Sequence, residues 1–153
     1  YFYMLGSMGL ASSIGLGLSL SIDKNVISID GDGSVLMNMN TLATIGNRAP
    51  NNYTLLIIDN GSYGSTGDQK TFTDEKTSLK EVAIGAGCHN VIECKGSETS
   101  SNLNKALDDK NNSYVIISKI DPGNVTVKPI PINPITIRDR FRKTVGKVDY
   151  LKF

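Results

Sequence analysis

Apolar residues recur along this chain with two different spacings, and together these predict alternating helices and strands. The spacing of Leu10, Ile14 and Leu18 predicts a helix over residues 10–22. Three later segments with helical character lie at 35–48, 79–87 and 97–109. Short apolar and β-branched runs predict strands at 24–30, 52–60, 90–95 and 113–121. We therefore expect an α/β fold in which helices flank both faces of a mostly parallel sheet.

The segments between these elements predict one long loop and one extended tail. Residues 61–78 are rich in Gly, Ser and Thr, and a loop of this length inside a compact domain tends to be functional. An extended tail is marked by Pro122, Pro129, Pro131 and Pro134, and a short basic helix is expected over 136–145. The 153 residues fit a single domain, 1–153. Because the chain starts in mid-pattern without Met, we expect its native N-terminus to be truncated.

Composition narrows the class of protein. With 39% hydrophobic residues the chain can bury a core, and its net charge of +1 argues against nucleic-acid or membrane binding driven by charge. The uncharged first 22 residues contain four glycines and five serines and lack the basic flank of a signal peptide, so we interpret them as a loop and helix of a soluble domain. Cys88 and Cys94 are expected to be free thiols in a reducing cytoplasm. One histidine, His89, argues against a structural zinc site.

Polar side chains follow two successive predicted strands. The first strand ends at Gly31-Asp32-Gly33-Ser34, and the second ends at Asn60-Gly61-Ser62. Ligands of open α/β sheets bind at the carboxyl ends of strands, so Asp32 and Asn60 should meet there if the strands are neighbours. Carboxylate and amide oxygens suit Mg²⁺. The sequence therefore predicts a magnesium site at this edge.

An anion site is predicted beside the metal. Gly33 and Ser34 open the next predicted helix, where free N–H groups and the helix dipole favour an anion. Metal ligands next to an anion site indicate a metal-bridged diphosphate. The segment is neither a Walker A loop, since no Gly-Lys-Ser/Thr follows, nor a Gly-x-Gly-x-x-Gly dinucleotide fingerprint.

The spacing of the motif carries a family resemblance. Gly-Asp-Gly is followed by twenty-six residues (34–59) and then by Asn60, which resembles the signature of the thiamine diphosphate-dependent decarboxylases and synthases. The upstream "GSMGLASSIGLGLSL" and the downstream "NGSYGSTG" also look like segments of that family. The resemblance covers roughly residues 3–120. Within the family it is greatest to sulfopyruvate decarboxylase β subunits and next to phosphonopyruvate decarboxylases.

The resemblance implies a cofactor, thiamine diphosphate with Mg²⁺, and a role for each matching residue. Asp32, the Asn60 side chain and the backbone carbonyl of Ser62 would bind the metal. Met8 would hold the cofactor in its bent form. The remaining cofactor-binding residues would be Gly6, Ser7, Gly31, Gly33, Ser34, Tyr63 and Gly64, with the carbonyl of Gly6 facing the aminopyrimidine.

Simpler interpretations of these residues stay open at this point. Asp32 could cap a helix, and Asn60 could serve a common Asn-Gly turn. Met8 could fill a gap in the core, and Tyr63 could pack a loop. For His89 and Cys88 we expect structural roles. Three arginines of the basic segment could meet an acidic substrate, but a solvated face is the more common use of such a charge run: Arg138, Arg140 and Arg142.

One group that the resemblance requires is missing from the chain. Family members use a Glu of a separate pyrimidine-binding domain to activate the cofactor, and all four glutamates here follow the Gly-Asp-Gly motif. The resemblance therefore implies a β subunit with no complete catalytic set of its own, paired with a pyrimidine-binding α subunit in a hetero-oligomer. The implied reaction is decarboxylation of a 2-oxo acid, with 3-sulfopyruvate giving sulfoacetaldehyde and CO₂ in coenzyme M biosynthesis of methanogenic archaea.

Other functions remain as alternatives. Phosphonopyruvate or another 2-oxo acid could be the substrate, because no residue visibly selects the anion. Ferredoxin-coupled 2-oxo acid oxidoreductases also have a separate diphosphate-binding subunit, but cysteines of the kind associated with their clusters are not evident. A degenerate cofactor-fold binding module is the non-enzyme alternative. The intact pair of Asp32 and Asn60 argues against it.

Overall fold

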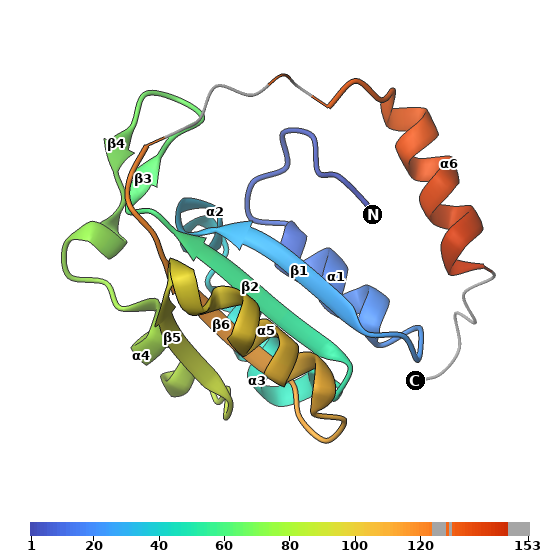
Figure 1. Cartoon of the computed structure of the whole chain (residues 1–153), viewed down its shortest axis with the longest axis horizontal. Coiled ribbons are helices and arrows are strands. Elements are labelled where there is room, and N and C mark those ends of the chain that lie inside the picture. The colour runs from blue at the N-terminus through green and yellow to red at the C-terminus, as the bar shows by residue number, and fades with distance from the viewer. Residues whose placement is uncertain (124–127, 129, 147–153) are drawn as a thin grey trace.

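A four-stranded parallel sheet forms the centre of the molecule (Figure 1). The computed structural model describes residues 1–123, 128 and 130–146. In spatial order the strands are β1 (Val26–Gly31), β2 (Tyr53–Asp59), β6 (Tyr114–Lys119) and β5 (Val91–Lys95). Every pair in this sheet is parallel, which confirms the predicted α/β class.

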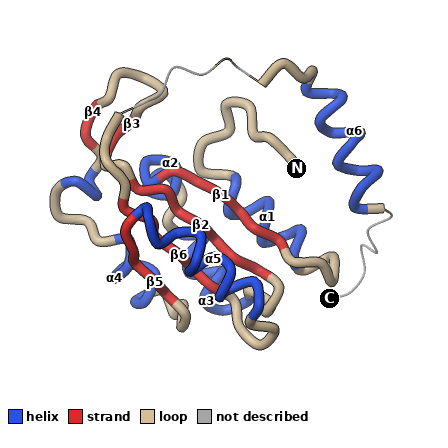
Figure 2. The backbone as a smooth tube through the Cα atoms, in the orientation of Figure 1, coloured by secondary structure: helices blue, strands red, loops and turns tan. Residues whose placement is uncertain are grey.

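Helices cover the two faces of the sheet unequally (Figure 2). The helices are α1 (Ala11–Ser19), α2 (Asp32–Met37), α3 (Asn40–Arg48), α4 (Leu79–Gly85), α5 (Thr99–Asp108) and α6 (Pro134–Val145). In the larger core cluster, the four helices α1, α2, α3 and α4 pack on one face of the sheet. In the smaller cluster, α5 packs on the other face. On β1, Ile27 and Ile29 alternate with buried residues and stay 38% and 62% exposed.

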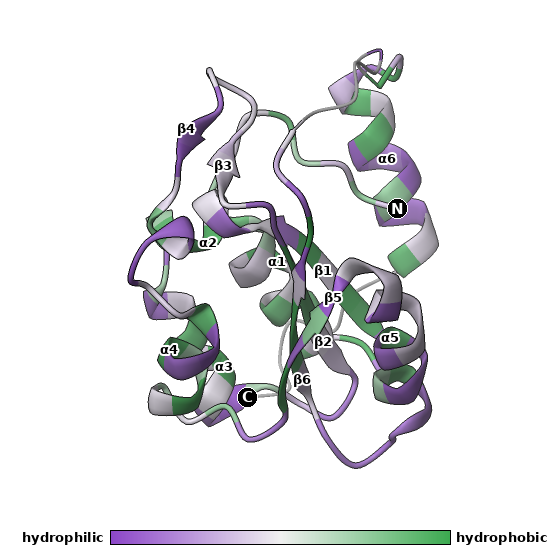
Figure 3. Cartoon of the chain, turned by 60° about the vertical axis from the view of Figure 1, so that its left-hand side comes forward, coloured by the Kyte–Doolittle hydropathy of each residue, from purple (hydrophilic) through white to green (hydrophobic). Residues whose placement is uncertain are grey.

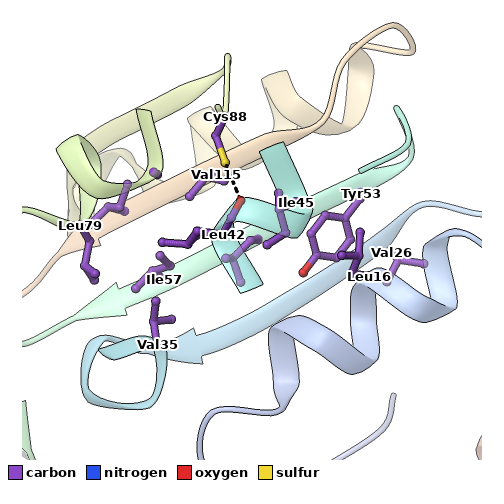
Figure 4. Packing of buried hydrophobic residues seen from close by; sticks show 13 residues of the cluster. Leu16, Val26, Val35, Leu42, Ile45, Tyr53, Ile57, Leu79, Cys88 and Val115 are labelled. Carbon is purple, nitrogen blue, oxygen red and sulfur yellow. Dashed lines mark hydrogen bonds between the residues drawn. The ribbon is translucent and has the colours of Figure 1, made fainter. Parts of the chain in front are cut away.

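The larger core is built around β2, whose residues Tyr53, Leu55 and Ile57 are fully buried (Figure 4). The hydroxyl of Tyr53 lies 2.9 Å from the carbonyl oxygen of Ser12 and 3.1 Å from Oγ of Ser28, and burial raises the pKa of this phenol. Buried polar groups need such partners. The core is therefore anchored to α1 and β1 by hydrogen bonds as well as by apolar packing.

Gly15 explains how α1 comes so close to the sheet. A Cβ atom at this position would lie 1.8 Å from Oγ of Ser28 on β1. A side chain would force the helix away from the strand, so glycine is required for this close approach.

The prediction of one helix over 35–48 is wrong. The segment forms two helices, because α2 ends at Met37 and α3 begins at Asn40. Asn38 between them has non-helical dihedral angles, and its amide donates to the carbonyl oxygen of Gly9 at 2.5 Å and to Oγ of Ser13 at 3.1 Å. Asn side chains compete with helical hydrogen bonding in this way.

The predicted loop at 61–78 contains short regular pieces. β3 (Ser62–Tyr63) and β4 (Gln69–Lys70) form an antiparallel pair, followed by the 3-10 turn η1 (Phe72–Asp74). A second such turn, η2 (Gly96–Glu98), precedes α5. Colouring by hydropathy shows β4 as hydrophilic, whereas the strands of the main sheet are largely hydrophobic (Figure 3). The hairpin therefore stands outside the core, at the carboxyl edge of the sheet.

The described part of the chain after β6 contains one helix, α6, which begins two residues earlier than predicted. Asn133 caps this helix by accepting a hydrogen bond from the backbone N–H of Ile135 at 2.8 Å, and Pro134 occupies its first turn. Of the predicted extended tail, residues 124–127 and Pro129 lie outside the described residues. Within the described ranges, no helix is long and apolar enough to cross a membrane.

Candidate functional site

The carboxyl ends of β1 and β2 lie side by side and form the wall of a pocket of about 210 Å³. Asp32 and Asn60, the two predicted metal ligands, both line it, as the sequence predicts. Nine of the eleven predicted site residues belong to its lining: Met8, Gly31, Asp32, Gly33, Ser34, Asn60, Ser62, Tyr63 and Gly64. Ile58 and Ser65, which sequence reasoning missed, complete it.

The remaining two predicted residues, Gly6 and Ser7, lie in the N-terminal segment just before Met8 and do not line the pocket. The segment is fastened to the site a little further on. The backbone N–H of Gly9 donates to Oγ of Ser34 at 2.7 Å, and the carbonyl oxygen of Gly9 accepts from Asn38. These bonds bring Met8, which is 41% exposed, to the rim of the pocket.

Asp32 is 1% exposed and its carboxylate is held by two hydroxyl groups. Oγ1 of Thr71 lies 2.5 Å from Oδ2 of Asp32, and Oγ1 of Thr73 lies 3.0 Å from the same atom. The N-cap of α2 is Gly31, and no side chain caps that helix end. The Asp32 carboxylate is therefore directed to the loop at 71–73 and does not cap α2.

A second buried carboxylate lies behind the first. Asp59, at the end of β2, is 2% exposed and pairs with Nζ of Lys119 at 2.5 Å. Oδ1 of Asp59 accepts from Oγ1 of Thr73 at 2.8 Å and from the backbone N–H of Gly61 at 3.2 Å. Sequence reasoning missed Asp59, Lys119 and both threonines. Only Asp59 gave a signal, as a charged residue at the end of an apolar strand.

Asn60 forms the turn that leaves β2. Its Oδ1 accepts from the backbone N–H of Ser62 at 3.1 Å, and Gly61 has a positive φ of 66°. The carbonyl oxygen of Gly61 accepts from the backbone N–H of Thr71 at 2.9 Å, which joins the turn to the loop beside Asp32. An amide oxygen has two lone pairs, so the turn bond leaves Oδ1 of Asn60 able to accept a metal.

The ring of Tyr63 lies directly over Gly33. A Cβ atom at Gly33 would be 2.4 Å from Cε1 and 2.6 Å from Cδ1 of that ring. The absence of a side chain at Gly33 therefore permits the hairpin to close onto the start of α2. Tyr63 packs against the motif, as the loop-packing interpretation expects, and also lines the pocket.

Asp30, two residues before Asp32, is a buried carboxyl group that sequence reasoning also missed. Burial raises its pKa, while hydrogen bonding from Ser34 and from the backbone N–H of Gly31 opposes the shift. Oδ1 accepts the Gly31 bond at 3.1 Å, whereas Oδ2 has no hydrogen-bond partner among the described residues. The start of the motif thus contains two buried carboxyl groups.

The cysteines, the histidine and the arginines of α6 do not line the described pocket at the carboxyl ends of β1 and β2. Cys88 and His89 follow α4 and line a pocket at the amino ends of the strands, with Asn90 and Tyr114. Both cysteines are free and buried, burial raises the pKa of the Cys88 thiol, and its Sγ lies 3.6 Å from the carbonyl oxygen of Leu42. The arginines of α6 do not line the carboxyl-edge pocket in the described structure; Arg138 pairs with Asp139 on the surface.

Comparison with protein families and solved structures agrees with this architecture. Residues 1–118 match the model of the thiamine pyrophosphate enzyme, C-terminal TPP binding domain. A putative thiamin diphosphate-dependent enzyme from Mycobacterium smegmatis has a similar fold, with a TM-score of 0.57 and 16% identity over 76% of this chain and 23% of that chain.

Closer relatives are found among curated proteins. The chain is 49% identical to sulfopyruvate decarboxylase subunit beta of Methanocaldococcus jannaschii, over 95% of this chain and 77% of that protein. It is 42% identical to sulfopyruvate decarboxylase of Methanosarcina acetivorans, over 94% of this chain and 37% of that protein. With phosphonopyruvate decarboxylase of Streptomyces viridochromogenes the identity is 38%, over 95% of this chain and 36% of that protein. The chain therefore belongs to the thiamine pyrophosphate enzymes, in the family that includes the sulfopyruvate decarboxylase β subunits.

Proposed function

We propose that this chain is the β subunit of a two-chain sulfopyruvate decarboxylase, which converts 3-sulfopyruvate to sulfoacetaldehyde and CO₂ in coenzyme M biosynthesis. The observation that carries the proposal is the 49% identity, over nearly the whole chain, to the archaeal β subunit. The position of the pocket at the carboxyl edge of the sheet supports it.

The donor atoms of the pocket fit Mg²⁺ and a diphosphate. Asp32 offers a carboxylate, Asn60 an amide oxygen and Ser62 a backbone carbonyl, which together form the oxygen-rich set that Mg²⁺ prefers. In the described part of the chain, no three His, Cys, Asp or Glu side chains gather as a metal site. Gly31, Gly33, Ser34, Tyr63 and Gly64 would surround the diphosphate.

The chain's contribution to the reaction is binding and orientation. When bound, thiamine diphosphate supplies the nucleophile and the electron sink for decarboxylation. Met8, at the rim of the pocket, would support the cofactor in its bent form, and the carbonyl group of Gly6 would orient the aminopyrimidine. Ile58 and the ring of Tyr63 provide apolar walls of the pocket.

The acid that activates the cofactor would come from a pyrimidine-binding partner subunit. No glutamate is among the residues that line the described pocket. The chain spans 77% of a relative named as a β subunit but 37% of a relative whose name mentions no subunit. A separate α subunit, assembled with this chain into a cytoplasmic hetero-oligomer, accounts for both observations.

Phosphonopyruvate is the second candidate substrate, because two relatives at 38% and 35% identity are phosphonopyruvate decarboxylases. A phosphonate carries more negative charge than a sulfonate near neutral pH. No cationic side chain lines the described pocket, so the group that distinguishes the two anions would belong to the partner subunit.

The test is decarboxylation by the chain co-purified with its α subunit, using sulfopyruvate, phosphonopyruvate and pyruvate, each with and without thiamine diphosphate and Mg²⁺. We expect cofactor-dependent turnover that is selective for sulfopyruvate and abolished by Asp32→Ala. Asp108→Ala, which removes an exposed carboxylate at the end of α5, serves as the control and should keep full turnover. Turnover selective for phosphonopyruvate would identify phosphonopyruvate as the substrate in place of sulfopyruvate. A well-formed complex that binds no cofactor would overturn the proposal.

A further inference from the structure

A series of hydrogen bonds connects Asp32 to an ion pair on two central strands, formed by the buried Asp59 and the partly exposed Lys119. It runs from Oδ2 of Asp32 to Thr73, from Thr73 to Oδ1 of Asp59, and from Oδ2 of Asp59 to Nζ of Lys119. We propose that Thr73, fixed by the Asp59–Lys119 pair, is a positioning residue that orients the Asp32 carboxylate for the metal. The inference rests on the proposed function, because it assumes that Asp32 is a metal ligand.

The threonine hydroxyl protons can be assigned to individual hydrogen bonds of this network. Each threonine hydroxyl donates one hydrogen bond and accepts up to two. Thr71 lies 2.5 Å from Oδ2 of Asp32, so its proton belongs to that bond. Thr73 lies 3.0 Å from Oδ2 of Asp32, 2.8 Å from Oδ1 of Asp59 and 2.8 Å from Oγ1 of Thr71. Its single proton can be donated to only one of these acceptors at a time, so Thr73 lies between the two carboxylates and contacts both.

Lys119 makes this arrangement possible. Two buried carboxylates close together repel each other unless a cation compensates one of them. Lys119 pairs with Asp59 at 2.5 Å and so places a cation beside the carboxylate that Thr73 also contacts. The Cα atoms of Asp59 and Lys119 are partners in the β2–β6 register, so the ion pair is placed by the sheet and not by a loop.

The geometry also assigns the two oxygens of Asp32 to different tasks. Among the described residues, both hydrogen bonds to this carboxylate reach Oδ2. Oδ1 is left for a ligand in the pocket. Carboxylates that bind metals are generally held by such outer partners, and removing one partner typically weakens metal binding about 10- to 100-fold.

The experiment measures Mn²⁺ affinity of the co-purified two-chain complex by electron paramagnetic resonance in the presence of thiamine diphosphate, with Mg²⁺ as the competitor. Thr73→Val removes the hydroxyl at nearly constant volume, and we expect a Kd for Mn²⁺ that is roughly 10- to 100-fold higher. Thr73→Ser keeps the hydroxyl and should stay within about threefold of wild type. Turnover of Thr73→Val should return toward wild type at saturating Mg²⁺, which a merely structural defect would not allow.

Thr77→Val is the matched control, because Thr77 is half-buried on the same loop and is not part of the network. Lys119→Met should also weaken Mn²⁺ binding. In the double variant with Thr73→Val, the two losses of Mn²⁺ binding free energy should be less than additive, since both substitutions act through the same series of contacts. Wild-type affinity in Thr73→Val, or no recovery with Mg²⁺, would overturn the inference. If the wild-type complex itself bound no Mn²⁺, the proposed function would fail instead.

Discussion

Gly33 carries no side chain, and the ring of Tyr63 occupies the space where one would stand. In Gly33→Ala the new Cβ would lie 2.4 Å from Cε1 of that ring, so the hairpin must move away from the motif. Such overpacking costs about 1–3 kcal/mol. We expect thiamine diphosphate to bind about 10- to 100-fold more weakly to the two-chain complex, measured by isothermal titration calorimetry.

A control and a rescue test this cause. Gly17→Ala meets no atom within 4 Å and should leave cofactor affinity unchanged. The melting temperature of the unliganded complex should fall in Gly33→Ala and recover partly when Tyr63→Ala is added, because the smaller side chain removes the clash. Equal melting temperatures in Gly33→Ala and wild type would show that the ring does not fill this space.

Single residues also show where sequence reasoning stops. The position of Asp32 and Asn60 at one edge of the sheet was predictable, because each follows a strand and the two strands are neighbours. Thr71 and Thr73 were not predictable, since threonines in a Gly/Ser/Thr-rich loop give no periodic signal and meet Asp32 only after the loop folds back. Lys119 was missed for a similar reason, because its partner Asp59 is sixty residues away.

At the scale of elements, the break between α2 and α3 holds the N-terminal segment against the site. The amide of Asn38 donates to Gly9 and Ser13, and the Gly9 N–H donates to Ser34. Asn38→Ala removes two of these bonds, at a cost of about 1 kcal/mol each. We expect faster hydrogen exchange at the amides of residues 9 and 10, measured by mass spectrometry or NMR.

Asn47→Ala provides the comparison, because the exposed Asn47 side chain donates to the carbonyl oxygen of Ala43 within the same helix. Exchange at residues 9 and 10 should not change in that variant. Unchanged exchange in Asn38→Ala would mean that the Ser34 bond alone holds the segment. The interruption itself was missed because helical spacing continues through Leu36, Met39 and Leu42, and period alone does not reveal a side chain that bonds to a distant backbone.

At the scale of the whole molecule, much apolar surface is left uncovered. Among the described helices, α5 alone contributes to the core cluster on the second face of the sheet. Ile29 of β1 is 62% exposed, and Phe2 and Leu5 of the N-terminal segment are also exposed. Patches of this kind mark interaction surfaces or cause association. We expect the chain expressed alone to self-associate or precipitate, and the chain expressed with its α subunit to elute as one defined complex in size-exclusion chromatography with light scattering. A stable, dispersed monomer in the absence of the partner would contradict this.

The order of the strands has a consequence for how the protein is made. The sheet order places β6 between β2 and β5, although β6 is the last of its four strands along the chain. During synthesis β2 and β5 therefore each expose an unpaired edge until residues 114–119 have emerged, and such edges are prone to pair wrongly. The same strand delivers Lys119 to Asp59. The nascent chain thus completes its central sheet and the Asp59–Lys119 ion pair in one late step. A ribosome that pauses before this point leaves a chain with an incomplete sheet and without that ion pair.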